Sequence, residues 1–291
     1  MDRGSSLRLL DAAFEMGIRH FDTASIYGDG LAETWLGYWL RTRRLEGQVS
    51  IGTKVGIAAA RTWRRAASLW DELEASMRRL SVDRVDQLSL HVFPAQTITA
   101  LAKDLIRAHR AGRFRKLAST NEPWKAVEAL NAALGNSLRI EVVQVQYNLL
   151  DRAIESSPEA RGYVVEAWSP RGAGLLTAPT RCLPSQWREG RWHERMDLPR
   201  VQQLREALQR VADTHAAAID AVAIAWLCSR GVSPVVGARD VADLERCVAG
   251  QHLKLDFDAI QLLESTAPPG RPYEFRFIGQ FCPSTYQVVQ S

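Results

Sequence analysis

Cysteine is scarce in this sequence, and the cysteine spacings that mark a metal site or a disulfide framework are missing. The 291 residues include 4 cysteines, with no CxxC pair and no histidine-rich pairing: Cys182, Cys228, Cys247 and Cys282. Structural zinc sites and small disulfide-rich folds are recognised by such spacings. We therefore expect no metal site. Scattered thiols of this kind are typical of the reducing cytoplasm, which predicts a cytoplasmic protein.

Long apolar runs and blocks of like charge are also missing. The longest strongly apolar stretch is 221–228, far short of the roughly 20 residues that cross a bilayer. The first residues carry no apolar signal-peptide core. The net charge of +4 comes from 37 Lys and Arg against 33 Asp and Glu, with no basic block. We therefore expect no membrane partner and no nucleic-acid partner.

The sequence does contain enough apolar residues for a large core, arranged in two alternating patterns. Hydrophobic residues make up 46% of the chain and charged residues 24%, as in globular proteins. Short apolar runs predict strands, and segments with apolar residues every three or four positions predict helices. The predicted strands are 18–23, 49–54, 85–91, 114–120, 140–146, 163–168 and 232–236. The predicted helices are 5–16, 33–43, 66–80, 97–111, 123–134, 201–214, 218–229 and 241–248.

Alternating strands and helices with short connections predict a parallel sheet with right-handed crossovers. Polar residues lie at the carboxyl end of nearly every predicted strand: Asp22, Lys54, His91, Asn121, Gln144 and Ser169. An open doubly wound sheet gathers its ligand contacts near one switch point, whereas a closed barrel uses all its strand ends. We therefore predict an α/β fold of the (β/α)8 TIM-barrel type with seven recognisable strands. It should form one domain over 1–291, with 268–291 as a C-terminal tail.

Four of these residues form a candidate acid–base set. Asp22 ends the first strand and Tyr27 follows in a glycine-containing loop, while Lys54 and His91 end two later strands. Carbonyl reduction needs a hydride donor, a polarised carbonyl and a proton for the developing alkoxide. Tyrosine ordinarily has a pKa near 10, so a neighbouring cation helps it act as an acid near neutrality. Each residue alone is more often structural, and the interpretation depends on all four together.

At these residues the chain resembles the aldo-keto reductase superfamily, and the resemblance covers nearly its whole length. Residues 17–28, with Glu33 and Gly37, resemble that family's first signature. Gly52-Thr53-Lys54 and Leu90-His91 resemble the strands that carry its lysine and histidine. The resemblance implies that Tyr27 is the proton donor, assisted by Lys54 and His91, and that Asp22 bridges to Lys54.

The resemblance also implies a cofactor and its contacts. The family takes its hydride from NADPH, bound without a glycine-rich Rossmann turn, so the absence of GxGxxG here is no argument against a nicotinamide cofactor. Ala118-Ser119-Thr120-Asn121 resembles the family's Gly-Val-Ser-Asn segment, which implies that Thr120, Asn121 and Gln144 hold the carboxamide. Trp168-Ser169-Pro170 resembles Tyr-Ser-Pro, which implies that Trp168 stacks on the nicotinamide with Ser169 beside it. Asp197 falls in a long loop that corresponds to the family's cofactor-covering loop.

Two departures concern the cofactor phosphates. Arg171 stands where the family commonly has leucine, and it either binds phosphate or faces solvent. Residues 236–240 resemble Pro-Gly-Ala-Ser-Arg and supply Gly237, but Arg239 and Asp240 replace the serine and arginine. An arginine beside a 2′-phosphate favours NADPH, while Asp240 there would repel it. The expected cofactor is therefore NADPH, with NADH as the alternative.

A third departure is at the N-terminus. Family members carry a small hairpin and the first barrel strand before this point, whereas the first predicted helix here starts almost at Met1. The resemblance therefore implies a barrel without that hairpin and strand. Three explanations stay open: a truncated start, a gap filled by the tail or by a partner chain, or a fold that tolerates an open seam.

The expected function is reduction of an aldehyde or ketone by an NAD(P)H-dependent oxidoreductase. A polar mouth of Arg61, Arg64, Arg65, His193 and Arg271 would suit sugar-type carbonyls, although surface arginines are also an ordinary feature. The alternative is a non-catalytic or weakly active member that binds cofactor or regulates a partner. The altered phosphate residues and the missing strand favour that alternative, and the intact set of four residues opposes it.

Overall fold

The computed structural model describes residues 2–56, 68–91, 93, 98–177 and 198–269. The chain divides into two compact units. Unit 1 contains the described residues up to Gln144 together with Arg161–Val164. Unit 2 contains Val145–Ala160 and the described residues from Val165 onwards. The predicted tail, 268–291, falls almost entirely outside the described residues.

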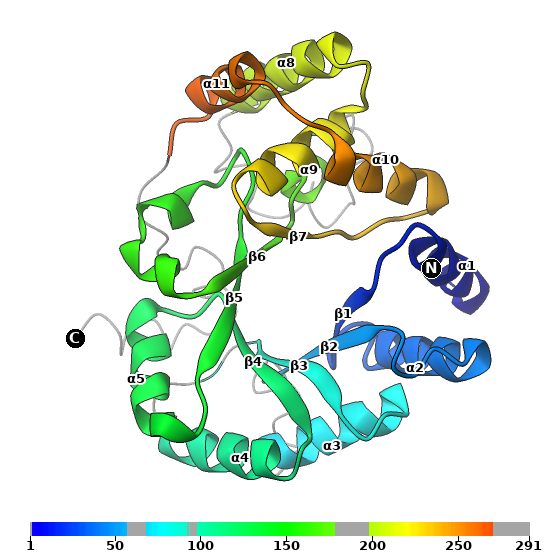
Figure 1. The fold of residues 1–291 in the computed structure, drawn as a ribbon, viewed down its shortest axis with the longest axis vertical. Helices are drawn as coiled ribbons and strands as arrows, with labels where there is room; N and C mark the ends of the chain where they lie inside the picture. The colour runs from blue at the N-terminus through cyan, green and yellow to red at the C-terminus, as the bar shows by residue number, and fades with distance from the viewer. Residues whose placement is uncertain (1, 57–67, 92, 94–97, 178–197, 270–291) are drawn as a thin grey trace. The chain divides into compact units, whose positions relative to one another are not determined.

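Seven parallel strands follow one another in chain order within one sheet (Figure 1). Their bounds are β1 His20–Ala24, β2 Ser50–Val55, β3 Val85–Leu90, β4 Phe114–Thr120, β5 Ile140–Gln146, β6 Val164–Trp168 and β7 Ser233–Val235. Each predicted strand is present and shifted by no more than two residues. A chain-ordered parallel sheet with intervening helices is the topology of the (β/α)8 TIM-barrel class, so the predicted fold class is confirmed, with seven strands in the part that the structure describes.

The helices of unit 1 follow the predicted pattern and lie along the outer side of its strands (Figure 1). They are α1 Arg3–Glu15, α2 Leu31–Arg43, α3 Leu69–Leu80, α4 Ile98–Arg110 and α5 Trp124–Leu134. Asp2 caps α1 by accepting a hydrogen bond from the Ser5 amide at 2.9 Å, and Ser68 caps α3 through the Asp71 amide at 3.2 Å. Such caps satisfy amides that have no partner inside the helix.

The described part of unit 2 contains one α-helix that the sequence pattern did not predict. Its helices are α8 Leu198–Thr214, α9 Ile219–Ser229, α10 Val241–His252 and α11 Phe257–Thr266. The unpredicted one is α11, which buries only Ala259 and Leu263 and so leaves a weak periodic signal. Its N-cap was readable, because Asp256 accepts a hydrogen bond from the Ala259 amide at 2.8 Å. Helix α10 runs past the predicted end at 248.

Glu33 and Gly37 of α2 hold that helix against α3 and β2. Glu33 is fully buried and accepts hydrogen bonds from the Thr53 hydroxyl at 2.5 Å and from Arg79 Nε at 2.6 Å. A Cβ on Gly37 would lie 2.5 Å from the backbone carbonyl oxygen of Arg79. Glycine at position 37 therefore permits the close approach of the two helices. The hydrogen bond between Glu33 and Thr53 holds β2 at the residue before Lys54.

No single helix among those described has the length and apolar character to cross a membrane. The segments Pro199–Thr214 and Ile219–Ser229 meet that test only when taken together, and they are bent by 94° where they join.

Candidate functional site

The predicted acid–base residues of unit 1 lie at the carboxyl ends of adjacent strands. In the β1–β2 ladder Asp22 is opposite Gly52 and Ala24 is opposite Lys54. The next ladder pairs Val55 with Leu90, the residue before His91. Parallel pairing in this register brings side chains that are distant in sequence to one edge of the sheet.

Asp22 and Lys54 form a buried ion pair. The Lys54 ammonium contacts Asp22 Oδ2 and also donates to the Thr23 carbonyl oxygen at 3.1 Å. Lys54 is 1% exposed. A buried ammonium is costly unless it is paired and hydrogen-bonded. The Gln144 side-chain amide nitrogen lies 3.5 Å from Asp22 Oδ1 on the other side of the carboxylate, so Asp22 connects the lysine to the end of β5.

Tyr27 is exposed beside this ion pair and beside His91. Tyr27 is 42% exposed, whereas Lys54 and His91 are buried. The Lys54 ammonium is 5.3 Å from the centroid of the phenol ring, and the His91 ring meets that ring edge-on with centroids 6.2 Å apart. Lys54 and His91 therefore lie against one phenol, which solvent or a ligand can reach.

His91 is held neutral by its surroundings. Burial, reinforced by the positive charge of Lys54, lowers the pKa of the His91 imidazole to about 3. Its Nδ1 is buried and has no hydrogen-bond partner among the residues that the structure describes. A neutral imidazole can donate or accept a hydrogen bond without adding a charge, so His91 is suited to polarising an uncharged carbonyl.

We expect the free energy of unfolding to decrease as the pH falls from about 6.5 to about 3 because of His91. In this window the unfolded chain binds a proton at residue 91 and the folded protein does not, so stability increases with pH there. One such group contributes a slope of up to about 1.4 kcal/mol per pH unit. Urea unfolding at several pH values should give a shallower dependence for His91→Asn than for the wild type. Parallel curves would contradict the neutral, buried imidazole.

The sequence pattern missed Glu72 of α3, which ties together the segments after β1 and β2. Its carboxylate accepts hydrogen bonds from the Ser25 hydroxyl at 2.8 Å and from the Gly56 amide at 3.2 Å. Glu72 therefore braces the backbone that leads to Tyr27. A signal was available, because the helical period through Leu69, Leu73 and Ser76 puts residue 72 on the buried face.

The predicted carboxamide contacts of unit 1, Thr120, Asn121 and Gln144, are buried together at the ends of β4 and β5. Thr120 is opposite Gln144 in the ladder, and the Asn121 amide donates to the Gln144 carbonyl oxygen at 3.1 Å. Asn121 has a φ of 57°, an uncommon left-handed conformation that ends the strand sharply. The Thr120 hydroxyl oxygen is buried without a hydrogen-bond partner in the described part of the chain. A buried polar atom without a partner is a candidate ligand contact.

In unit 2, Trp168 ends β6 and Ser169 makes the turn after it. Ser169 has a φ of 56°, and its hydroxyl accepts a hydrogen bond from the Ala173 amide at 2.8 Å. Its carbonyl oxygen accepts one from the Asn148 side chain at 3.0 Å. Both Trp168 and Ser169 are partly exposed. The turn is therefore fixed from two sides, and Trp168 is partly exposed at the strand end.

Arg171 lies in a network of ion pairs rather than free in solvent. One terminal nitrogen is 2.7 Å from Asp220 and 2.8 Å from Asp243, and the other donates to the Gly237 carbonyl oxygen at 2.7 Å. Its side chain is 14% exposed. Arg246 contacts the same two carboxylates at 3.3 and 2.9 Å. The Arg171 guanidinium thus holds the loop after β7 against α9 and α10.

Arg239 and Asp240 have different environments although they are adjacent. The Arg239 side chain is 64% exposed and lies 3.3 Å from Asp243. Asp240 caps α10 by accepting a hydrogen bond from the Asp243 amide at 2.8 Å. Burial alone would raise the pKa of the Asp243 carboxyl, but hydrogen bonds from Arg171 and Arg239 hold it below its ordinary value. The cluster therefore keeps the Asp243 carboxylate ionised and leaves the Arg239 side chain exposed.

Some sequence-based expectations lie outside the described residues. The predicted polar mouth and the loop residue expected over the cofactor belong to this group: Arg61, Arg64, Arg65, Asp197, His193 and Arg271. Within the described ranges, no group of three or more His, Cys, Asp or Glu side chains is arranged to hold a metal ion.

Comparisons with known proteins give one family for the chain. A family model described as the Aldo/keto reductase family matches residues 1–267. A probable aryl-alcohol dehydrogenase of Saccharomyces cerevisiae, AAD4, is 27% identical over 96% of this chain and 92% of its own length. An uncharacterized oxidoreductase of Bacillus subtilis, YrpG, is 29% identical over 92% and 89%.

Solved structures show the same fold. The crystal structure of the thermostable aldo-keto reductase Tm1743 with the inhibitor epalrestat matches with a TM-score of 0.74 at 24% identity, over 91% of this chain and 88% of that one. The aldo-keto reductase from Klebsiella pneumoniae in complex with NADPH matches with a TM-score of 0.73 at 20% identity, over 94% and 88%.

Proposed function

The chain belongs to the aldo/keto reductase family, and from this premise we propose that it reduces an aldehyde or ketone with NADPH, using Tyr27 as the proton donor. The observation that carries the proposal is the arrangement around one exposed phenol. The Asp22–Lys54 ion pair and the neutral His91 are buried beside Tyr27, and the Lys54 ammonium is 5.3 Å from its ring.

In this proposal each side chain has one task. His91 donates a hydrogen bond to the carbonyl oxygen and so withdraws electron density from the carbonyl carbon. As the carbonyl carbon receives a hydride and the C–O π electrons move onto the oxygen, the Tyr27 hydroxyl transfers its proton to that oxygen, which produces the alcohol and leaves a tyrosinate. The Lys54 ammonium stabilises the negative charge on the phenol oxygen. Asp22 keeps the ammonium in place, and a proton from solvent restores Tyr27.

The residues at the strand ends are suited to a nicotinamide cofactor, which supplies the hydride to the carbonyl carbon when it is bound. In unit 1, the unpartnered Thr120 hydroxyl supports a role for Thr120, Asn121 and Gln144 in binding the carboxamide. In unit 2, Trp168 is partly exposed and its indole is suited to contact with an aromatic ring, and Ser169 fixes the turn beside it. We assign these five residues to cofactor binding.

The phosphate side of the proposed cofactor site depends on charges in unit 2. Arg239 is the exposed cation and Asp240 is occupied at the N-terminus of α10, which supports a preference for NADPH over NADH. Arg171 is assigned to the site through Gly237, whose carbonyl oxygen it binds. In this arrangement Arg171 shapes the loop, and Arg239 meets the 2′-phosphate.

The proposal is tested by titrating the protein with NADPH and with NADH, followed by quenching of tryptophan fluorescence. Consumption of NADPH is then measured with a panel of aldehydes and ketones that includes sugars. We expect tighter binding of NADPH and turnover of at least one carbonyl class. Binding without turnover of any carbonyl would instead favour a non-catalytic cofactor-binding protein, and failure to bind either cofactor would refute both.

A further inference from the structure

Unit 1 carries a groove whose lining contains neither Tyr27 nor Lys54. It encloses about 640 Å³ and is lined by side chains from α1, α2 and α3, which pack side by side (Figure 1). Helix α1 contributes Arg3, α2 contributes Trp35, Tyr38 and Arg41, and α3 contributes Arg78 and Arg79. Four guanidinium groups and two aromatic rings thus come from three helices to one concave surface.

One of the four arginines is neutralised and three are not. Arg79 pairs with the buried Glu33 at 2.6 Å. Arg41 and Arg78 are exposed, and they have no carboxylate partner among the described side chains. The guanidinium of Arg3 lies 5.3 Å from the centroid of the Tyr38 ring, a cation–π contact that orients it and leaves its charge uncompensated.

The carboxylates of the same three helices do not offset these charges. Asp11 pairs with Arg43, and Glu74 pairs with Arg113. Asp71 and Glu72 lie in the first turn of α3 and do not line the groove, about 9–11 Å along the helix from Arg78 at 1.5 Å per residue. The remaining acidic residue, Glu15, ends α1, about 18 Å along the helix from Arg3 at 1.5 Å per residue. No carboxylate lines the groove among the described residues, and of its four guanidinium groups only Arg79 is in an ion pair, so the local charge in the groove is positive.

We propose that this groove binds a nucleotide-type ligand, whose phosphates lie on Arg3, Arg41 and Arg78 and whose aromatic base packs on Trp35. Guanidinium groups bind phosphate oxygens through paired hydrogen bonds, and several of them around one hollow favour a multiply charged phosphate. Trp35 is partly exposed and lines the same groove. An indole face offers a stacking surface for a flat heterocycle.

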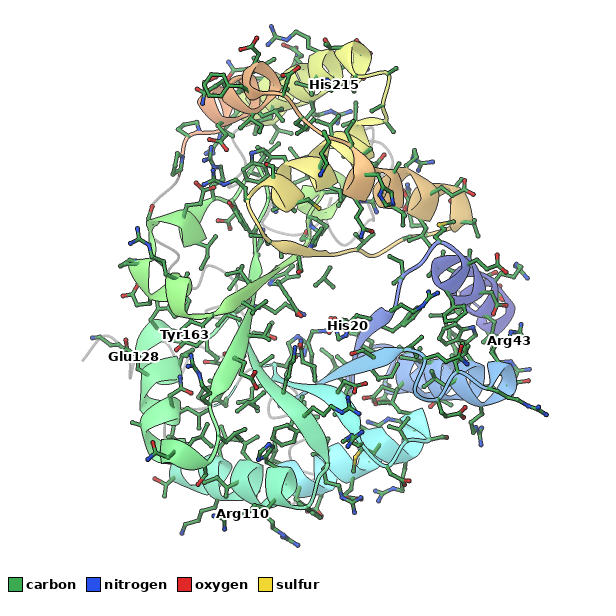
Figure 2. The ribbon with its side chains drawn as sticks, in the orientation of Figure 1. His20, Arg43, Arg110, Glu128, Tyr163 and His215 are labelled. Carbon is green, nitrogen blue, oxygen red and sulfur yellow. The ribbon has the colours of Figure 1, made fainter. Side chains whose placement is uncertain are left out.

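The test uses the whole protein, with ATP and inorganic pyrophosphate as probes and isothermal calorimetry as the measurement. The double variant Arg41→Gln/Arg78→Gln should weaken the binding of both probes by about tenfold or more, because two charge-assisted contacts are lost. The matched control is Lys103→Gln/Arg110→Gln. It removes the same charge from exposed positions of α4, where Figure 2 shows Arg110 pointing outward, and should bind both probes as the wild type does.

The variant Trp35→Leu distinguishes the contribution of the base to binding from that of the phosphates. It should weaken ATP binding and leave pyrophosphate binding unchanged, and Arg239→Gln, at the proposed cofactor site, should leave the binding of ATP to the groove unchanged. The proposal is wrong if neither probe binds, if the two double variants lose affinity equally, or if ATP and pyrophosphate bind equally well. It is also wrong if Arg239→Gln abolishes ATP binding, since the ATP would then occupy the cofactor site.

Discussion

Replacing Tyr27 with phenylalanine should lower kcat for carbonyl reduction by about 10²- to 10⁴-fold, the usual contribution of a positioned general acid. The change removes one oxygen atom and keeps the ring that meets His91 edge-on and lies 5.3 Å from Lys54. Because Tyr27 is 42% exposed, loss of its hydroxyl leaves no buried cavity. The affinity for NADPH, measured by tryptophan quenching, should therefore stay within about twofold of the wild type.

The matched control is Tyr163→Phe. Tyr163, labelled in Figure 2, accepts a hydrogen bond from the Asn131 side chain at 3.1 Å and lies beside Trp124 of α5. Its hydroxyl is remote from the proposed chemistry, so kcat should be unchanged. If Tyr27→Phe keeps wild-type turnover, the proton comes from another group and the assignment of Tyr27 is wrong.

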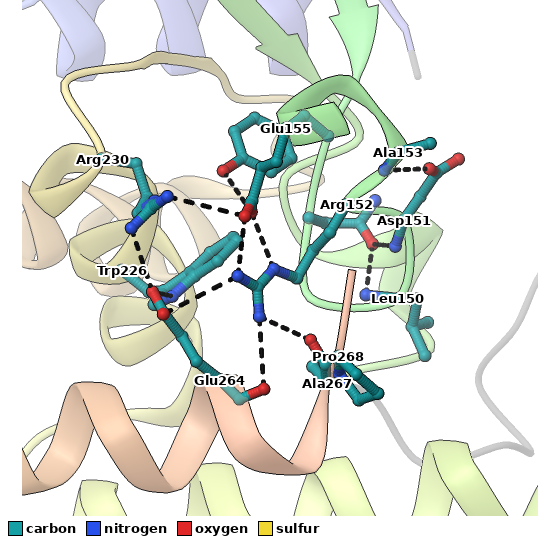
Figure 3. A network of polar contacts seen from close by, with 12 residues as sticks. Leu150, Asp151, Arg152, Ala153, Glu155, Trp226, Arg230, Glu264, Ala267 and Pro268 are labelled. Carbon is teal, nitrogen blue, oxygen red and sulfur yellow. Dashed lines mark hydrogen bonds and ion pairs between the residues drawn. The ribbon is translucent and has the colours of Figure 1, made fainter. Parts of the chain in front are cut away.

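Replacing Arg152 with methionine should destabilise the protein by about 3–5 kcal/mol, the usual result of removing one partner of a buried ion pair. Figure 3 shows the contacts that would be lost. The guanidinium binds both carboxylate oxygens of Glu155 at 2.7 Å and donates to the carbonyl oxygens of Glu264 and Ala267 at 3.3 and 2.5 Å. Arg152 is 3% exposed. The variant would leave the Glu155 carboxylate without this ion-pair partner. It would also leave the Glu264 and Ala267 carbonyl oxygens, at the end of α11, without their guanidinium donor.

Arg230→Met is the control, because Arg230 contacts the carboxylates of Glu155 and Glu264, which Arg152 also contacts, from a more exposed position. Its side chain is 38% exposed, and it lies 3.5 Å from Glu155 and 3.3 Å from Glu264. Ion pairs near the surface contribute about 0–1 kcal/mol. Chemical denaturation of both variants gives the comparison. Equal destabilisation by the two variants would mean that burial is not what makes Arg152 important.

The order of elements and the residues at the strand ends could be predicted from the sequence. Apolar runs and helical periods found all seven described strands because each is a short run rich in apolar residues, and β1 to β5 are largely buried. They missed α11, which buries two side chains and has only its Asp256 cap as a clear signal. Glu72 was missed for a related reason: a carboxylate on a helix is ordinarily read as exposed, and only the structure shows it accepting bonds from Ser25 and Gly56.

The sequence by itself determined the family, the strand order and the identity of the four candidate catalytic groups, because these depend on local patterns and on residue types. Only the tertiary structure decided their electrostatic state. Pairing of β1 with β2 buries Lys54 against Asp22, and burial keeps His91 neutral. The tertiary structure also decided the environment of Arg171. The sequence left two alternatives, that Arg171 binds phosphate or that it faces solvent. In the structure it is held by Asp220 and Asp243. The charge and burial of a side chain depend on neighbours that folding brings together, and a local sequence pattern does not contain those neighbours.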